Sequence, residues 1–199
     1  MFSLPILLAS TFLPALASSA KFCESTDLNL TVTESLWDGQ CTYPKADRSF
    51  ELNQYLGRWY QVAGTRAPFT ARGSCIYAEY GLNDNGTVSV SNGCQLGNRS
   101  ITIQGTADAA DEIYGSDGVF RVQFPGRPGH FCPGPNYIVQ QRSEDWAIVQ
   151  ASNFSTLFLL SREQNPGEGS IMGWLVSAGK LGSDLTDVIR TNQTGRLFT

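Results

Sequence analysis

The residues best suited to chemistry in this chain are a histidine and a cysteine that lie two positions apart. His130 is the only histidine in the sequence, and Cys132 follows it in a loop rich in glycine and proline. An adjacent imidazole can activate a thiol as a nucleophile, so Cys132 is a candidate catalytic residue if it is not bridged. The alternative is a covering loop that contains a disulfide. One histidine gives little support to a metal site or a Ser-His-Asp triad, so we expect neither.

The other thiols must be assigned before Cys132 can be judged. The five cysteines are Cys23, Cys41, Cys75, Cys94 and Cys132, which indicates disulfides plus one leftover thiol in a secreted chain. If the turn between the strands predicted over 75–82 and 87–94 is centred on Asp84-Asn85, Cys75 lies directly opposite Cys94. Opposed residues of a non-hydrogen-bonded pair bring their Cβ atoms within roughly 4.5–5.5 Å, which suits a disulfide. We therefore predict Cys75–Cys94, and we pair Cys41 with Cys132 or with Cys23.

The N-terminus indicates export. Residues 1–20 carry no charged side chain and combine an apolar run with small residues near a cleavage site, as in a secretory signal peptide. The run is shorter than the ~20 residues that span a bilayer, and no later segment is long and apolar enough to do so. We expect a signal peptide over 1–20, an N-terminal arm over 21–49, one domain over 50–199, and a secreted, extracellular protein without a transmembrane segment.

The surface chemistry agrees with export. A net charge of −4 with scattered charges gives no electrostatic footprint for nucleic acid, so no nucleic-acid partner is expected. Sequons for N-glycosylation begin at Asn29, Asn85, Asn98, Asn153 and Asn192.

Short alternating segments follow residue 58 and are separated by glycine, asparagine and aspartate, as in a meander of antiparallel strands. The predicted strands cover 59–65, 75–82, 87–94, 100–107, 119–124, 137–141, 146–151 and 157–162. Eight strands can close into an up-and-down barrel that holds one small ligand. A helical turn over 50–56 precedes them. An amphipathic helix follows, from an N-cap at Asn165 to a stop at Gly182, with a short last strand over 187–191. The expected fold class is all-β, with this helix packed outside the barrel.

Alternation identifies candidate lumen residues. One face of the third strand carries Val88, Val90 and Asn92, and one face of the fifth carries Phe120 and Val122 with Phe124. An inward polar group such as Asn92 needs a hydrogen-bond partner. A ligand hydroxyl or carboxylate could provide it. Alternatively, Asn92 caps the strand end or binds a water.

Three segments resemble the lipocalin family, most closely the branch of apolipoprotein D and the bacterial outer-membrane lipocalins. They are Tyr55-Leu56-Gly57-Arg58-Trp59-Tyr60, the paired runs from Tyr137 and Trp146, and Leu157-Phe158-Leu159-Leu160-Ser161-Arg162. The resemblance implies that Gly57 and Trp59 open the first strand and that Arg162 packs over Trp59 to close the barrel floor. It also implies that Tyr80, Asn92 and Phe158 line the ligand cavity.

One departure from the family concerns the turn after the sixth strand. The family carries Thr-Asp-Tyr there, whereas this chain has Gln141-Arg142-Ser143. The carboxylate is lost and a cation appears, so the family's hydrogen bonds at the closed end do not carry over.

The function that we expect is a secreted carrier of a small hydrophobic ligand of the lipid, sterol, retinoid or bilin class, with no cofactor and no catalytic residue. The alternatives are a lipid isomerase that uses a free thiol, and an extracellular stress-response or lipid-protection protein with peripheral lipid contact. The oligomeric state is left open.

Overall fold

The computed structural model describes residues 33–67, 73–115, 117–127 and 129–195. The predicted signal peptide over 1–20, together with Cys23 and Asn29, lies outside these residues.

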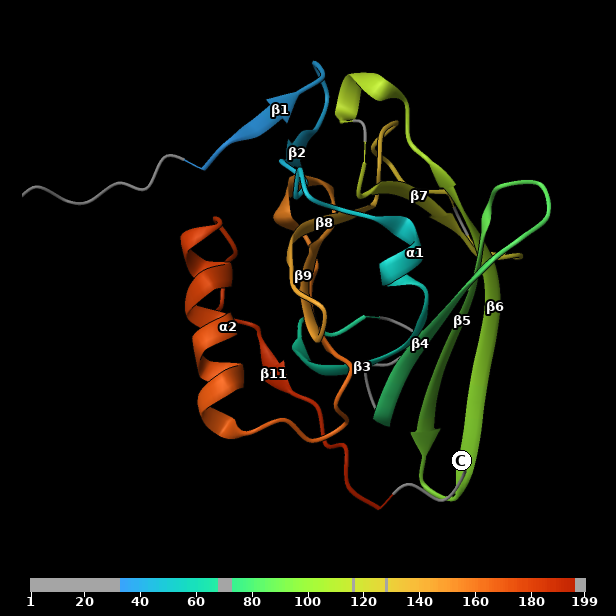
Figure 1. Cartoon of the computed structure of the whole chain (residues 1–199), viewed down its shortest axis with the longest axis vertical. Coiled ribbons are helices and arrows are strands. Elements are labelled where there is room, and N and C mark those ends of the chain that lie inside the picture. Colours follow the sequence, from blue (N-terminus) through green and yellow to red (C-terminus); the bar gives the residue numbers. More distant parts are fainter. Residues whose placement is uncertain (1–32, 68–72, 116, 128, 196–199) are drawn as a thin grey trace, which may run out of the picture. The chain divides into compact units, whose positions relative to one another are not determined.

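Eight antiparallel strands, β3 to β10, form a closed barrel (Figure 1). Consecutive strands are neighbours, and β10 pairs back with β3, which confirms the predicted fold. The strands are β3 (Gly57–Gly64), β4 (Ser74–Leu82), β5 (Val88–Leu96), β6 (Arg99–Ala109), β7 (Val119–Gln123), β8 (Tyr137–Arg142), β9 (Trp146–Gln150) and β10 (Leu157–Ser161). The short helix α1 (Leu52–Tyr55) precedes β3, as predicted, and two 3₁₀ turns, η1 (Glu112–Tyr114) and η2 (Ser152–Phe154), lie between strands.

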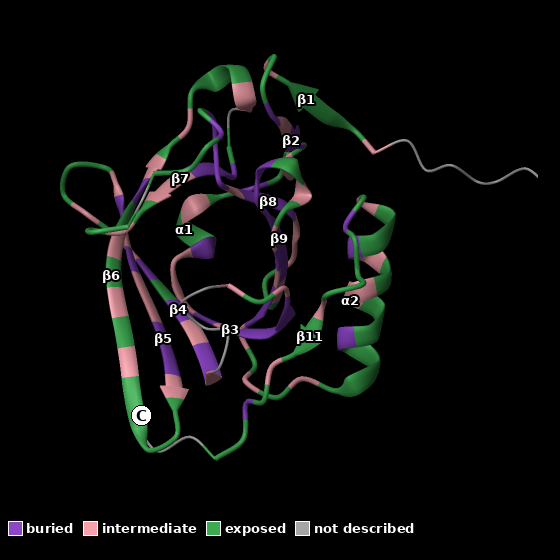
Figure 2. Ribbon diagram, turned by 180° about the vertical axis from the view of Figure 1, so that it is seen from behind, coloured by how far each residue is buried: buried purple, intermediate pink, exposed green. Residues whose placement is uncertain are grey.

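Alternation along β10 divides its side chains between the lumen and the outer helix. Phe158 and Leu160 belong to the lumen cluster, while Leu157 and Leu159 pack with residues of α2 (Glu168–Lys180). Burial is high on β9 and β10, whose outward side chains pack with α2 together with those of β3; β9 is mostly purple in Figure 2. The helix begins at Glu168, after Gly167, rather than at the predicted Asn165 N-cap.

The N-terminal arm contains two strands that the sequence did not reveal. The hairpin of β1 (Ser35–Trp37) and β2 (Thr42–Pro44) lies against the barrel through a cluster that includes Tyr43 and Ile138. Its covalent tie is the disulfide between Cys41 and Cys132, one of the two pairings left open above.

The predicted Cys75–Cys94 disulfide is wrong, since both thiols are free and buried. From Tyr77 to Leu82 the hairpin register is offset by one residue from the predicted one, whereas Ser74 again faces Gln95. The shift between these two registers is a bulge, which leaves both Cys75 and Ile76 opposite Cys94. Cys75 lies in a bulge with φ +50°. Its Sγ donates to a backbone carbonyl of the C-terminal tail, 3.5 Å away, instead of approaching Cys94.

The C-terminal tail fills a seam of the barrel. β3 and β4 pair over only four residues each, and β11 (Ile189–Arg190) adds to the end of β3 as the predicted last strand. Beyond β11, the buried Gln193 donates Nε2 to Gln61 O of β3 and to Ile76 O of β4, both at 2.8 Å. One side chain therefore joins the two strands where their ladder has ended.

Candidate ligand-binding site

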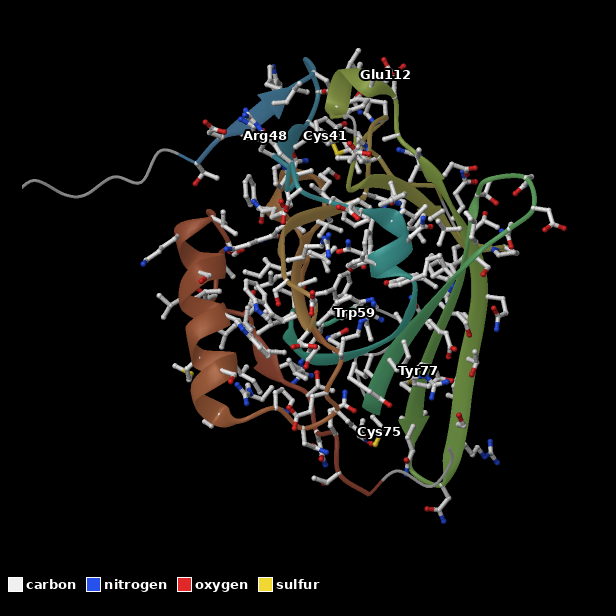
Figure 3. The ribbon with its side chains drawn as sticks, viewed as in Figure 1. Cys41, Arg48, Trp59, Cys75, Tyr77 and Glu112 are labelled. Carbon is white, nitrogen blue, oxygen red and sulfur yellow. A yellow bond between two sulfur atoms is a disulfide. The ribbon has the colours of Figure 1, made fainter. Side chains whose placement is uncertain are left out.

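The floor of the barrel is closed by the motif residues. The Arg162 guanidinium carbon lies 3.7 Å from the Trp59 ring centroid, the contact implied by the resemblance. Arg162 also donates to the carbonyls of Gln54, Leu56 and Arg58 at 2.7–2.9 Å, so it joins α1 to β3. Trp59 Nε1 donates to Tyr55 O at 2.7 Å, which satisfies the buried indole (Figure 3). Gly57, the first residue of β3, has φ +90°, a backbone conformation that residues with an L side chain rarely adopt.

At this end of the barrel, Arg142 makes hydrogen bonds of its own to the N-terminal arm and to α1. Its Nη2 donates to Ser49 O at 3.1 Å and to Gln54 Oε1 at 2.9 Å, while its backbone N donates to Asp47 Oδ2 at 3.1 Å. The guanidinium lies over the Phe50 ring, 5.8 Å from its centroid. The carboxylate missing from the turn is thus supplied by the N-terminal arm.

Three tyrosine hydroxyls form a chain inside the barrel, next to α1. Tyr137 Oη lies 2.7 Å from Tyr55 Oη and 2.8 Å from Tyr80 Oη. Burial raises the pKa of all three phenols, that of Tyr80 to about 12, so the cluster is neutral at physiological pH. Tyr80 was predicted to line the lumen from the resemblance, whereas Tyr55 and Tyr137 were not predicted as lumen residues. Both could have been identified, because Tyr55 and Tyr137 each begin one of the segments that resemble the lipocalin family.

A small cavity remains beside this tyrosine cluster. Three predicted pocket residues line it, namely Tyr80, Phe120 and Val122. The other lining residues are Leu52, Tyr55, Val88, Ala107 and Tyr137. Its volume of about 20 Å³ accommodates one water molecule. The space next to α1 is thus too small for a lipid-sized ligand, and the barrel wall continues away from α1 along β3 and β5.

The other two predicted residues, Asn92 and Phe158, lie in that direction. Asn92 is four residues beyond Val88 on β5, roughly 13 Å at 3.3 Å per residue. Phe158 faces Gly64, at the end of β3 that is remote from α1.

Asn92 presents an unsatisfied group on the lumen side of the sheet. Its cross-strand partner Ala78 belongs to the lumen cluster, and directly paired residues share a face. Asn92 Oδ1 is shielded from solvent and accepts no hydrogen bond from any residue that the structure describes. The wall of the barrel thus contains an amide oxygen that is available to a donor.

The structure does not support Cys132 as a nucleophile, because Cys132 is bridged to Cys41. The predicted histidine–thiol pair is not formed, because Cys132 in this bridge has no thiol for the exposed His130 to activate. The free thiol on the lumen face is that of Cys94, two residues beyond Asn92 on β5. Burial raises the pKa of this thiol, which disfavours the reactive thiolate.

Among the described residues, none of the helices has the length and apolar character needed to cross a membrane.

Comparison with known proteins places the fold in context. Residues 50–193 match the family model of the lipocalin-like domain. Mouse apolipoprotein D is 32% identical over 122 residues, which cover 60% of this chain and 61% of that protein. The bovine protein is 38% identical over 88 residues, covering 44% of this chain and 40% of its own length. The chain thus spans less than two thirds of these two relatives.

Other similar proteins are matched over more of their length. The outer membrane lipoprotein Blc of Vibrio cholerae is 29% identical over 147 residues, 72% of this chain and 83% of that protein. Among solved structures, insecticyanin from the tobacco hornworm has a TM-score of 0.57 at 19% identity, covering 78% of this chain and 87% of its own. Lobster apocrustacyanin A1 has a TM-score of 0.56 at 17% identity, covering 72% and 79%. These two structures share the fold.

Proposed function

The chain belongs to the lipocalin family, whose members bind small hydrophobic ligands, and we propose that it carries an apolar ligand with a hydroxyl or N–H donor at one end. The observation that carries this proposal is the shielded Oδ1 of Asn92, which has no hydrogen-bond partner among the described residues and lies on the same face of β5 as Val88 and Val90. The apolar body of the ligand would pack beside Phe158, beyond the tyrosine cluster.

The free energy of a hydrogen bond to Asn92 Oδ1 sets how strongly the protein should prefer ligands with a donor. A buried acceptor without a partner costs about 1–3 kcal/mol, and a ligand that donates to it recovers this free energy. That range corresponds to roughly 5- to 150-fold in affinity. Burial of the apolar body, at about 25 cal/mol per Å², contributes equally for a ligand with or without the donor. The ratio between matched ligands therefore isolates the contribution of Asn92.

The test uses ligand pairs that differ in one proton donor. Retinol is compared with retinyl methyl ether, and cholesterol with its methyl ether, by titration followed through tryptophan fluorescence. The alcohols should bind more tightly by the factor above. In Asn92→Leu this preference should disappear, whereas Ser91→Ala is the matched control because Ser91 lies on the opposite face and its Oγ accepts from Gln104. Absence of saturable binding for every ligand would refute the carrier function, and an unchanged preference in Asn92→Leu would refute the role of Asn92.

We also propose that the protein is secreted. The Cys41–Cys132 disulfide supports an oxidising compartment, since such bonds are rare in the cytosol. The sequons at Asn85, Asn98 and Asn192 lie on exposed residues, as glycan acceptors must. Expression in eukaryotic cells should yield the bridged, glycosylated chain in the medium. Retention of a reduced, unmodified chain inside the cells would contradict this proposal.

A binding function is better supported than a thiol enzyme. The bridge at Cys132 removes the predicted nucleophile, and Cys94 is buried where its thiol is favoured over the thiolate.

A further inference from the structure

A second concave site lies on the outside of the barrel, separate from the lumen. It is a groove of about 470 Å³ where the N-terminal arm, β8 and the C-terminal end of α2 meet (Figure 1). Its lining consists of Thr33, Glu34, Lys45, Ala46, Arg48, Gln140, Lys180 and Leu181. This volume lies within the range of sites that bind small molecules.

The groove concentrates positive charge on an acidic protein. Two of the three lysines in the sequence, Lys45 and Lys180, line it together with Arg48, against a single carboxylate, Glu34. The whole chain carries a net charge of −4, so this local excess of two positive charges opposes the overall balance.

Most of this charge is available to a ligand. Lys45 Nζ is paired with the Glu34 carboxylate. Arg48 and Lys180 are exposed, and no carboxylate lies within ion-pair distance of either among the described residues. In contrast, Arg58 and Arg190 are each held by a glutamate. The two free cations of the groove can therefore approach one anion without breaking an existing ion pair.

The groove also contains a buried polar group without a partner. Gln140 is only 7% exposed and donates Nε2 to Leu181 O at 3.2 Å. That hydrogen bond fixes the amide and occupies a carbonyl at the end of α2. Gln140 Oε1 is shielded and accepts no hydrogen bond within the described part of the chain. A ligand that reaches Gln140 must therefore bring a donor as well as a negative charge.

We propose that this groove binds a phosphate or sulfate ester that bears a free hydroxyl group. The anion is held by Arg48 and Lys180, and the hydroxyl donates to Gln140 Oε1. Arg48 supplies a planar fork of donors that matches the oxygens of a phosphate, and Lys180 adds a point charge. A free polyol phosphate and the headgroup of an anionic phospholipid share this chemistry.

The experiment measures binding of defined probes to the full chain. Calorimetric titration with glycerol 3-phosphate is compared with methyl phosphate, which has the charge but no hydroxyl. Glycerol 3-phosphate should bind at least about fivefold more tightly, as expected for one satisfied buried acceptor. Binding should weaken as salt is raised, because exposed charges are screened.

Paired variants test the location. Arg48→Gln combined with Lys180→Gln should weaken binding at least about tenfold, as expected for two lost charge-assisted contacts. Arg99→Gln combined with Arg127→Gln makes the same change of charge on exposed arginines outside the groove and should leave binding unchanged. Thermal unfolding of both variants should match that of the parent, since all four side chains are exposed.

Sedimentation with vesicles distinguishes the two sources of the anion. Binding to phosphatidylglycerol vesicles but not to phosphatidylcholine vesicles, lost in the groove variant, identifies a lipid headgroup. Binding of glycerol 3-phosphate alone identifies a soluble ligand. Equal binding by the groove and control variants, or no binding to either probe, would overturn the proposal. None of these readouts depends on a ligand in the lumen.

Discussion

Replacing Tyr137 by phenylalanine should destabilise the barrel more than any other single change in the tyrosine cluster. Three hydroxyls provide three protons, and the two hydrogen bonds of Tyr137 with Tyr55 and Tyr80 use two of them. Tyr55 and Tyr80 stack on each other, but in the part of the chain that the structure describes only the Tyr137 hydroxyl is hydrogen-bonded to both other hydroxyls. Without its hydroxyl, the other two lose their partner inside the lumen cluster.

The magnitude follows from the cost of isolated hydroxyls. A buried polar group that loses its partner costs about 1–3 kcal/mol, so two isolated hydroxyls cost about 2–6 kcal/mol. We expect about 3 kcal/mol for Tyr137→Phe, because each hydroxyl can rotate toward an alternative acceptor. Tyr55→Phe and Tyr80→Phe should cost about 1 kcal/mol each, since Tyr137 then keeps one partner. The triple phenylalanine variant should lie within about 1 kcal/mol of the parent, because removing all members of a buried polar network together is nearly neutral.

Urea unfolding of the four variants provides the test, with stability read from the midpoint at constant slope. A loss of 3 kcal/mol should also lower Tm by about 6–12 °C for a chain of this size. The decisive result is the order: the triple variant must be more stable than Tyr137→Phe alone. If the losses simply add, so that the triple variant is the least stable, the network argument is refuted.

The same cluster gives a dependence on alkaline pH. Burial raises the pKa of these phenols above 10, so the folded state favours the neutral form. Their contribution to stability is complete below pH 10 and is lost as the pH rises toward 12. The triple phenylalanine variant should therefore lose less stability than the parent between pH 10 and 12. An identical loss in both proteins would contradict the assignment.

Three further predictions concern the N-terminal arm, the seam between β3 and β4, and the glycosylation sequons. Backbone and tyrosine donors lower the pKa of Asp38 from 3.8 to about 2, so its support of the N-terminal arm is present above pH 4 and lost as the pH falls toward 2. Hydrogen exchange in β1 and β2 should therefore accelerate in that window, and Asp38→Asn should remove the pH dependence. Gln193→Ala should cost about 2 kcal/mol, measured by urea unfolding, since it removes two hydrogen bonds to backbone carbonyls. Asn85 and Asn153 are both exposed, but Asn153 Nδ2 lies 3.4–3.5 Å from the sulfurs of the disulfide, so glycopeptide mass spectrometry should find a glycan on Asn85 and not on Asn153.

Much of the barrel could be predicted because its signals are local. Alternation and turn residues determine where each strand begins and ends, and a side-chain period of two assigns the faces. Alternation placed Phe120 and Val122 on the lumen side, and both line the cavity there; Tyr80, which also lines it, was indicated by the resemblance. The contact between Trp59 and Arg162 joins residues far apart in sequence, and only the resemblance to a family indicated it.

The failed predictions depended on details that composition does not encode. A bulge at Cys75 changes the register by one residue, and such a shift moves a side chain to the other face of the sheet. The hydrogen bonds at the closed end could not be predicted either, because this chain has an arginine where the family has an aspartate in the turn after β8. The structure instead has Asp47 of the arm accepting from the backbone N of Arg142. No local pattern could pair two residues so distant in the chain.

The barrel is held unequally at its two ends, and this bears on how a ligand enters. Near α1, Arg162 and Arg142 each make several hydrogen bonds across elements. Two seams of the wall contain an amide side chain in place of a ladder residue. Next to the cavity near α1, Asn136 donates to Val122 O and accepts from Val122 N. Farther from α1, Gln193 joins β3 to β4, together with backbone hydrogen bonds between the C-terminal tail and both strands. The β3–β4 ladder covers only four residues of each strand, and beyond it the two strands are joined through the tail instead of directly. We therefore expect the wall to open first at this seam, toward the end of β3 where Phe158 lies and where the ligand is proposed to bind.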